Sequence, residues 1–212
     1  MNREIIMLLA SVAFLGACMA ATNPESREDF APVPTPGAGQ AVAVVAGGCF
    51  WCMESDFDKL EGVVATTSGY AGGQADSPTY MEVAGQGTGH LESLHVVYDT
   101  SKLTYEQVLT YFFHHVDPTD AGGQFCDRGP EYVTGIFPVD AEQAKVAEAV
   151  KASVGARLGR EIVTKTFEPG VRFWPAEAYH QDFHDTNPVR YTSYRMGCRR
   201  DEKVKALWGA TP

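Results

Sequence analysis

The sequence of 212 residues has little positive charge, no internal repeat and no apolar run long enough to span a membrane. Its 27 acidic residues outnumber its 17 lysines and arginines, and the net charge is −10, of which the first 40 residues contribute −2. Because an acidic protein is repelled by phosphate groups, we expect no nucleic-acid partner and no attraction to an anionic lipid surface. The apolar stretch from Ile5 to Leu15 is shorter than the ~20 residues of a spanning helix.

Cysteine is also scarce. The chain has five cysteines, at positions 18, 49, 52, 126 and 198. Cys18 is the last residue of the N-terminal export signal described in the next paragraph, so four cysteines remain for the domain. We interpret these four as redox or packing residues and not as a framework of structural disulfides.

The first 18 residues have the pattern of an export signal. An arginine near the start is followed by the apolar stretch and then by the small residues Gly16 and Ala17 before Cys18. Such an ending is typical of a bacterial lipoprotein processing site, where the cysteine becomes the lipidated first residue. We therefore predict a lipid-anchored protein of the bacterial cell envelope, facing the periplasm. The alternative is cleavage after Ala20, which leaves a soluble secreted or periplasmic protein.

The rest of the chain divides into a linker and one domain. Residues 19–40 contain four prolines and little apolar periodicity, which predicts a flexible tether. Residues 41–212 are long enough for one catalytic domain with a sizeable core.

The apolar patterns predict an α/β (α+β) fold. The expected elements are strands at 41–46, 63–68, 92–98, 131–137 and 161–167, and helices at 50–60, 104–114 and 140–156. Taken in chain order, the first six of these elements follow the order βαββαβ. This is the ferredoxin-like fold, with a mixed sheet and helices on one face. Thr104 with Gln107, and Asp140 with Gln143, stand where helix caps belong. After about residue 168 we expect a long, loop-rich tail with short helices near 176–184 and 201–208.

The most informative stretch is Gly-Gly-Cys-Phe-Trp-Cys, residues 47–52. It places Cys49 between a strand and a helix, where the unpaired N–H groups of a helix N-terminus favour an anion. The pKa of Cys49 should then lie below the free value of about 8.5, which would make Cys49 a nucleophile. The alternative is a buried cysteine that only packs in the core. The C-x-x-C spacing with Cys52 is also found in redox dithiols and metal sites.

This stretch resembles the signature of the peptide methionine sulfoxide reductase A family. Five further blocks agree with that family in its order, namely residues 67–73 (TSGYAGG), 78–83 (PTYMEV), 88–92 (TGHLE), 127–132 (DRGPEY) and 176–181 (AEAYHQ). The resemblance covers roughly residues 41–208, and five ordered blocks are far more specific than a lone motif. It implies reduction of the S epimer of methionine sulfoxide, in oxidised proteins and as the free amino acid. It also implies an intramolecular disulfide recycled by a thioredoxin-like donor outside the membrane. We expect no cofactor and a monomer.

The chemistry needs an acid and an apolar pocket beside the thiolate. Glu92 follows a glycine-rich loop at the start of an apolar strand, where burial would raise its pKa and let it donate a proton. Phe50 and Trp51 would form the wall for the S-methyl group.

Three more residues match the family at the pocket. Tyr80 and Tyr132 match the family's tyrosines that hydrogen-bond the sulfoxide oxygen, and Asp127 matches its pocket carboxylate. The chain departs from the family at Val133-Thr134 and at Cys126.

The second thiol that clears the product has three candidates. Cys198, which follows Gly197 in the polar tail, resembles the family's recycling cysteine and ranks first. Cys52 ranks second, because C-x-x-C disulfides form at helix N-termini, and Cys126 ranks third.

Two other function classes remain open. A thioredoxin-like oxidoreductase also uses C-x-x-C after a strand, but a Phe-Trp pair between the cysteines fits it poorly. A metal-binding lipoprotein could use Cys49, Cys52, His180 and His184. We favour the reductase and expect no metal.

Overall fold

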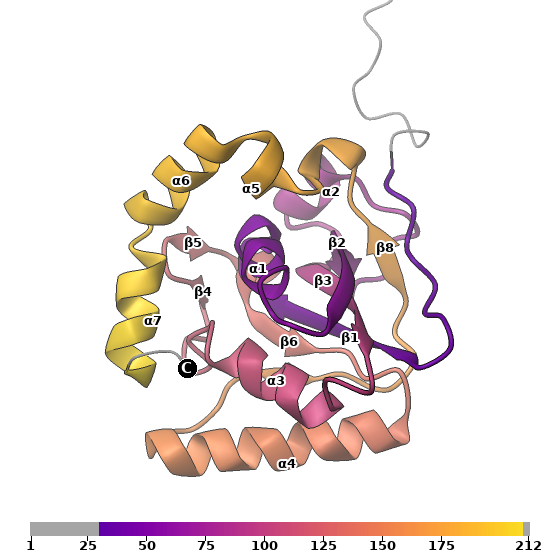
Figure 1. Ribbon diagram of the computed structural model, residues 1–212. Helices are drawn as coiled ribbons and strands as arrows, with labels where there is room; N and C mark the ends of the chain where they lie inside the picture. Colours follow the sequence, from indigo (N-terminus) through magenta and orange to yellow (C-terminus); the bar gives the residue numbers. More distant parts are fainter. Residues whose placement is uncertain (1–29, 210–212) are drawn as a thin grey trace, which may run out of the picture.

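The computed structural model describes residues 30–209, which fold around a six-stranded mixed sheet (Figure 1). The strand order is β7-β6-β1-β3-β2-β8. The strands are β1 (Gln40–Gly47), β2 (Val63–Ala71), β3 (Leu91–Asp99), β6 (Thr134–Ile136), β7 (Lys165–Thr166) and β8 (Phe173–Pro175). The central strand β1 runs antiparallel to β3 and β6, whereas β6 and β7 are parallel. A separate two-stranded hairpin is formed by β4 (Gly123–Gln124) and β5 (Asp127–Arg128).

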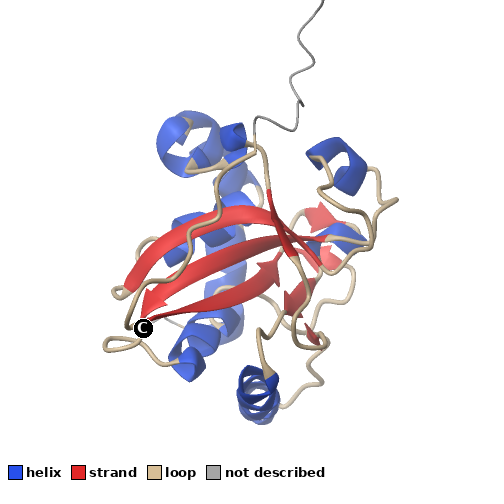
Figure 2. Ribbon diagram, turned by 90° about the vertical axis from the view of Figure 1, so that its right-hand side faces the viewer, coloured by secondary structure: helices blue, strands red, loops and turns tan. Residues whose placement is uncertain are grey.

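The long elements follow the predicted βαββαβ order, with β6 as the last strand, but a short helix, α2 (Tyr80–Ala84), stands between β2 and β3 where a loop was expected. Helices α1 (Phe50–Phe57), α3 (Tyr105–Phe113) and α4 (Ala141–Leu158) gather on one face of the sheet, as Figure 2 shows. The predicted caps are confirmed. The Thr104 side chain accepts from the Gln107 N–H at 3.2 Å, and Asp140 Oδ1 accepts from the Gln143 N–H at 2.8 Å.

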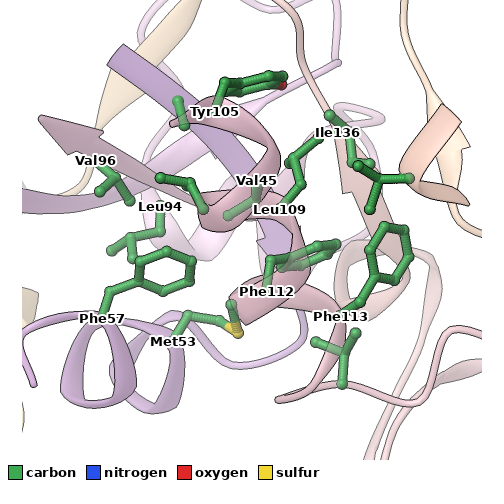
Figure 3. Close-up of a cluster of buried hydrophobic side chains, with 14 of the residues drawn as sticks. Val45, Met53, Phe57, Leu94, Val96, Tyr105, Leu109, Phe112, Phe113 and Ile136 are labelled. Atoms are coloured by element: carbon green, nitrogen blue, oxygen red, sulfur yellow. The ribbon is translucent and has the colours of Figure 1, made fainter. Parts of the chain in front are cut away.

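The core lies between the sheet and these helices. Because successive side chains of a strand point to opposite faces, Ala43 and Val45 of β1 face the helices while Val44 and Ala46 face the other side. Figure 3 shows the helix side, where Phe57 of α1 and Phe112 of α3 pack with the strand residues. Both faces of β1 are therefore covered, which holds the end of this strand in place just before Cys49.

The C-terminal part is more helical than the predicted loop-rich tail. It contains the edge strand β8, η3 (Ala178–His180), α5 (Phe183–Thr186), α6 (Pro188–Gly197) and α7 (Arg200–Trp208). The helix near 201–208 is confirmed, but sequence reasoning missed α6. This helix is largely exposed and polar, and it is stabilised by packing Tyr191 and Tyr194 against α1, which no local pattern reveals.

Part of the predicted tether contacts the domain. Phe30 forms a β-bridge with Glu177, and the N–H of Ala31 donates to the Ala176 carbonyl at 3.2 Å. Figure 1 shows this segment running alongside β8. The leader and Cys18 fall outside the described residues, so the predictions for them stay predictions. Among residues 30–209, no helix combines the length and apolarity needed to cross a bilayer.

Candidate active site

Two glycines shape the turn that carries Cys49. A Cβ on Gly47 would lie 2.4 Å from Met53 Sδ, and a Cβ on Gly48 would lie 2.5 Å from the Gln124 Cβ. Gly48 also has φ +79°, a left-handed conformation that favours glycine. Cys49 then takes the N-cap position of α1, and its carbonyl accepts from the N–H of Cys52 at 3.1 Å. The predicted placement of Cys49 between strand and helix is confirmed.

A cavity of about 80 Å³ opens in front of Cys49. Its lining brings together residues from the β1–α1 turn, the first turn of α1, α2 (Tyr80–Ala84), β3, β5, η2 (Pro130–Tyr132) and α6. The lining residues are Cys49, Phe50, Trp51, Tyr80, Glu92, Asp127, Tyr132 and Tyr194. Seven of these eight were singled out from the sequence. The larger hollows beside α3 are lined by no cysteine, so the small cavity is the one suited to thiol chemistry.

Glu92 is buried beside Cys49 in the cavity. Only 3 % of its surface is exposed, and its Oε2 accepts from the backbone N–H of Phe50 at 2.9 Å. That hydrogen bond favours the carboxylate, but burial outweighs it and raises the pKa of Glu92 to about 8, helped by the charges of Asp127 and Glu131. The carboxyl is therefore mainly protonated at neutral pH, as an acid catalyst requires.

The pKa of Cys49 differs from the sequence-based prediction. Burial raises it well above its ordinary value, and the neighbouring Cys52 and Glu92 raise it further. The expected lowering by the helix N-terminus is wrong, because burial dominates the pKa of Cys49, and the N–H of Phe50 donates to Glu92 and not to the sulfur. The Cys49 thiol instead hydrogen-bonds Cys52, which is the main reason that the pKa of Cys52 is lowered. The positive charges of Arg200 and Arg195 lower it further.

An aromatic cluster forms one wall of the cavity. Trp51 stacks on Phe183 with ring centroids 3.7 Å apart and an interplanar angle of 6°. Its indole N–H donates to His180 Nδ1 at 3.0 Å, and burial lowers the pKa of His180 to about 4, so this ring is a neutral acceptor at pH 7. His180 also contacts the rings of Phe50 and Tyr80, at 4.9 and 4.8 Å between centroids. His180 thus fixes the orientation of the wall.

Glu177 anchors the start of α2, the helix that carries Tyr80. This carboxylate is fully buried, and it accepts from the backbone N–H of Tyr80 at 2.8 Å and from the Tyr70 hydroxyl at 3.1 Å. The hydroxyl groups of Tyr80 and Tyr132 hydrogen-bond each other at the cavity. A buried charge with two donors is well satisfied, so it positions α2 firmly.

Residues 41–211 match the sequence model described as "Peptide methionine sulfoxide reductase". The chain belongs to this family. The reductase is 48% identical over 180 residues to "Peptide methionine sulfoxide reductase MsrA 2" of Rhizobium meliloti, covering 85% of this chain and 89% of that protein. Among solved structures it is similar to reduced Mxr1 from Saccharomyces cerevisiae, with a TM-score of 0.68, 32% identity and coverage of 73% and 90%. Mxr1 in complex with Trx2 shares the fold, with a TM-score of 0.50, 23% identity and coverage of 71% and 89%.

The reductase has two kinds of cysteine at this site. Cys126 and Cys198 form a disulfide with their Cα atoms 5.0 Å apart, whereas Cys49 and Cys52 are free and buried. The first- and third-ranked candidates for the second thiol are thus paired with each other. Tyr194, on the same helix as Cys198, donates its hydroxyl to Asp127 Oδ2 at 2.5 Å and also hydrogen-bonds Cys49.

The two histidines of the alternative metal-binding hypothesis contact other residues in this reductase. His180 Nδ1 accepts the indole proton of Trp51, and His184 Nε2 lies 3.5 Å from Asp58. Two positioning residues were not singled out from the sequence. Glu177 belongs to the family-like segment AEAYHQ at residues 176–181, so the sequence could have indicated it. Tyr194 lies on α6, a helix that the sequence did not predict.

Proposed function

We propose that this reductase converts the S epimer of methionine sulfoxide, in oxidised proteins and as the free amino acid, to methionine. The observation that carries the proposal is the cavity in which the thiol of Cys49, the protonated carboxyl of Glu92 and an aromatic wall meet. Reduction of a sulfoxide needs these three groups, because a nucleophile must attack sulfur while an acid protonates the departing oxygen.

The first step transfers the oxygen to the enzyme. The Cys49 sulfur bonds to the substrate sulfur while Glu92 protonates the sulfoxide oxygen. The hydroxyl oxygen then moves to the Cys49 sulfur, so that the S–O bond of the substrate and the bond between the two sulfurs both break, methionine leaves and Cys49 is a sulfenic acid. The thiol of Cys49 and the sulfoxide thereby become a sulfenic acid and methionine, so that the sulfoxide is reduced and Cys49 is oxidised. Tyr80 and Tyr132 support the oxygen, and Phe50 with Trp51 receives the S-methyl group.

The second step restores the thiol. A second cysteine condenses with the sulfenic acid, which releases water and forms an intramolecular disulfide, and a dithiol donor reduces that disulfide. We assign Cys198 as this second cysteine, because Tyr194 of the same helix already contacts Cys49. A thioredoxin-like protein suits the donor role, and Mxr1, which shares the fold, was solved in complex with Trx2.

Export remains part of the proposal. The apolar leader ending in Leu-Gly-Ala-Cys supports lipid attachment at Cys18, which would hold a monomeric reductase on the membrane surface in the periplasm. The repaired proteins would then be those of the envelope.

Turnover of each methionine sulfoxide epimer with dithiothreitol as reductant tests the activity. We expect methionine from the S epimer and little from the R epimer. Absence of methionine from both epimers, with a folded and fully reduced protein, would overturn the proposal.

A further inference from the structure

Three side chains of the kind that bind transition metals lie together between the β4–β5 hairpin and the end of α6. They are Cys126 in the turn of the hairpin, Asp127 at the start of β5 and Cys198 directly after α6. The two sulfurs and one carboxylate oxygen all lie within 4.8 Å of one another. The metal-binding alternative drawn from the sequence used Cys49 and Cys52, and neither belongs to this ligand cluster.

The ligand cluster is complete only when the disulfide is open. In the structure Cys126 and Cys198 are bonded to each other, and the thiolate is the form of cysteine that binds a metal. A dithiol donor converts the disulfide into two thiols. Thiolates combined with a carboxylate are typical zinc ligands, because zinc is a borderline-soft ion. Binding of a metal by this cluster should therefore depend on the redox state of the protein.

We propose that the reduced protein binds a zinc ion through Cys126, Cys198 and Asp127, with water as the fourth ligand. The zinc ion replaces the protons of the two thiols, so binding releases two protons and changes no oxidation state. The site itself does not depend on the function proposed above, whereas its effect on turnover rests on that function.

The distances suit a tetrahedral zinc site. Zinc lies about 2.3 Å from a cysteine sulfur and about 2.0 Å from a carboxylate oxygen, which separates sulfur from oxygen by about 3.5 Å and two sulfurs by about 3.8 Å. The Cys126 sulfur lies 3.6 Å from Asp127 Oδ1. The Cα atoms of Cys126 and Cys198 are 5.0 Å apart, so rotation of the side chains alone can bring the freed sulfurs to the required separation.

A hydrogen bond from α6 orients the carboxylate. Asp127 Oδ2 accepts from the Tyr194 hydroxyl at 2.5 Å, which leaves Oδ1 on the side of the Cys126 sulfur. Carboxylates that ligate a metal are commonly held by such an outer hydrogen bond, which fixes their orientation before the metal arrives. Tyr194 thus performs for this cluster the role of an outer-shell residue.

The surrounding charge also fits a bound zinc ion. Two thiolates and a carboxylate carry three formal negative charges, of which a zinc ion neutralises two. Arg200 lies over the ring of Phe125, with its guanidinium carbon 4.7 Å from the ring centroid, and it is buried beside the turn that carries Cys126. Its positive charge offsets the remaining negative charge of the site.

The cluster has a path to solvent. Cys126 is exposed, Asp127 is half-buried and Cys198 is buried. An ion can therefore reach the outer thiolate first and the inner one next. No fourth histidine, cysteine or carboxylate of residues 30–209 belongs to the cluster, so water completes the four ligands.

Zinc at this site should stop turnover after the first methionine. Cys198 is the cysteine assigned above to condense with the sulfenic acid of Cys49, and a thiolate bound to zinc is not free to attack. The first step needs Cys49 and Glu92, which lie outside the ligand cluster. The zinc-bound reductase should therefore form one methionine and remain as the sulfenic acid.

Cobalt, which has visible absorption, serves as the probe of binding. Reduced wild-type protein, freed of reductant and kept anaerobic, should bind one Co²⁺ with the bands of tetrahedral cobalt and of thiolate-to-cobalt charge transfer, and zinc should displace it. The same protein with its disulfide formed should show no such bands, and this comparison needs no variant.

Variants locate the ion. Cys126→Ser and Cys198→Ser should each weaken cobalt binding by more than about a hundredfold, and Tyr194→Phe, which removes only the outer hydrogen bond, by about tenfold. Cys52→Ser is the matched control and should bind cobalt like the wild type. If Cys52→Ser loses the cobalt bands while Cys126→Ser keeps them, the ion binds the C-x-x-C pair and the proposal is wrong. Absence of cobalt and zinc binding by the reduced wild type would also overturn it.

Dimedone labelling tests the effect on turnover. With one equivalent of zinc, reduced protein should form about one methionine per chain and carry dimedone on Cys49, whereas metal-free protein should carry little, because Cys198 removes the sulfenic acid. EDTA should abolish the difference. Equal labelling with and without zinc would contradict the inhibition. Absence of methionine from the metal-free protein would contradict the proposed function, while the cobalt titration would still decide whether the metal site exists.

Discussion

The backbone nitrogen of Phe50 lies 2.9 Å from Glu92 Oε2, so the first N–H donor of helix α1 points at the Glu92 carboxyl and not at the Cys49 sulfur. This hydrogen bond explains two properties of the site together. It fixes the buried carboxyl next to Cys49, and it withholds from the Cys49 sulfur the N–H group that would otherwise stabilise a thiolate. Burial raises both pKa values above neutral pH, that of Glu92 to about 8 in spite of this hydrogen bond and that of Cys49 well above its ordinary value.

The pH dependence of the first turnover follows from these two pKa values. Attack needs Glu92 protonated and Cys49 deprotonated at the same time. Below the Glu92 pKa of about 8 the acid is protonated while the thiolate fraction grows about tenfold per pH unit, so the rate should rise. Above it, loss of the acid offsets the growing thiolate fraction, and the rate should level off until Cys49 itself has titrated. Rapid-quench measurement of methionine against pH checks this profile.

Glu92→Gln should remove the bend in that profile. Glutamine keeps an acceptor for the Phe50 N–H but cannot donate a titratable proton, so the rate should fall on the order of a hundredfold and keep rising with pH through about 8. The exposed Glu142, replaced by glutamine, serves as the control and should behave like the wild type. An unaltered rate in Glu92→Gln would move the acid role to a tyrosine or to water.

Cys49→Ser tests the nucleophile. A serine hydroxyl at this position is not a practical nucleophile toward a sulfoxide sulfur, so methionine formation should be lost from both assays, with thioredoxin and with dithiothreitol. Circular dichroism should show an unchanged fold, since serine nearly matches the volume of cysteine. Appreciable methionine formation by this variant would remove Cys49 from the mechanism.

Glu177→Gln tests the positioning of Tyr80. The oxygen of the glutamine amide can still accept one of the two hydrogen bonds, but its NH2 group then faces the other donor, either the Tyr80 N–H or the Tyr70 hydroxyl. The lost hydrogen bond should destabilise the fold by about 1–3 kcal/mol. It should also lower kcat/KM through displacement of Tyr80. Tyr70→Phe is the matched control, because it removes one donor and leaves the Tyr80 contact in place. Equal activity of Glu177→Gln and wild type would show that Glu177 acts only on stability.

His180→Phe tests the aromatic wall. Phenylalanine keeps a ring between Phe50 and Tyr80 but removes the acceptor of the Trp51 indole N–H, so Trp51 should turn away and KM for the sulfoxide should rise. Trp51 fluorescence should change in parallel. His180→Asn, which restores an acceptor, should recover part of the affinity, and a KM that is the same in both variants would argue against this role.

Cys18→Ala tests the proposed localisation of the protein at the membrane. Mass spectrometry of the wild type should find an acylated Cys18 as the first residue, and the variant should leave the membrane fraction. A mature N-terminus at Ala21 would establish the ordinary secretion route.

The sequence by itself determined the features that depend on neighbours along the chain. An apolar run before Gly-Gly-Cys fixed Cys49 between a strand and a helix, and the capping pairs at Thr104 and Asp140 marked two helix starts. The βαββαβ order followed from the alternation of such runs. Seven residues of the cavity could be predicted from the sequence because they lie in short motifs that resemble a known family.

Only the tertiary structure decided what depends on groups far apart in the chain. The pKa of Cys49 follows from burial and from Glu92, which takes up the N–H of Phe50 from 42 residues away. The pairing of Cys126 with Cys198 spans 72 residues, and the helix that ends just before Cys198 is held by aromatic contacts with α1 and not by its own polar sequence. Burial and long-range contact set these properties, and neither is encoded in a local pattern.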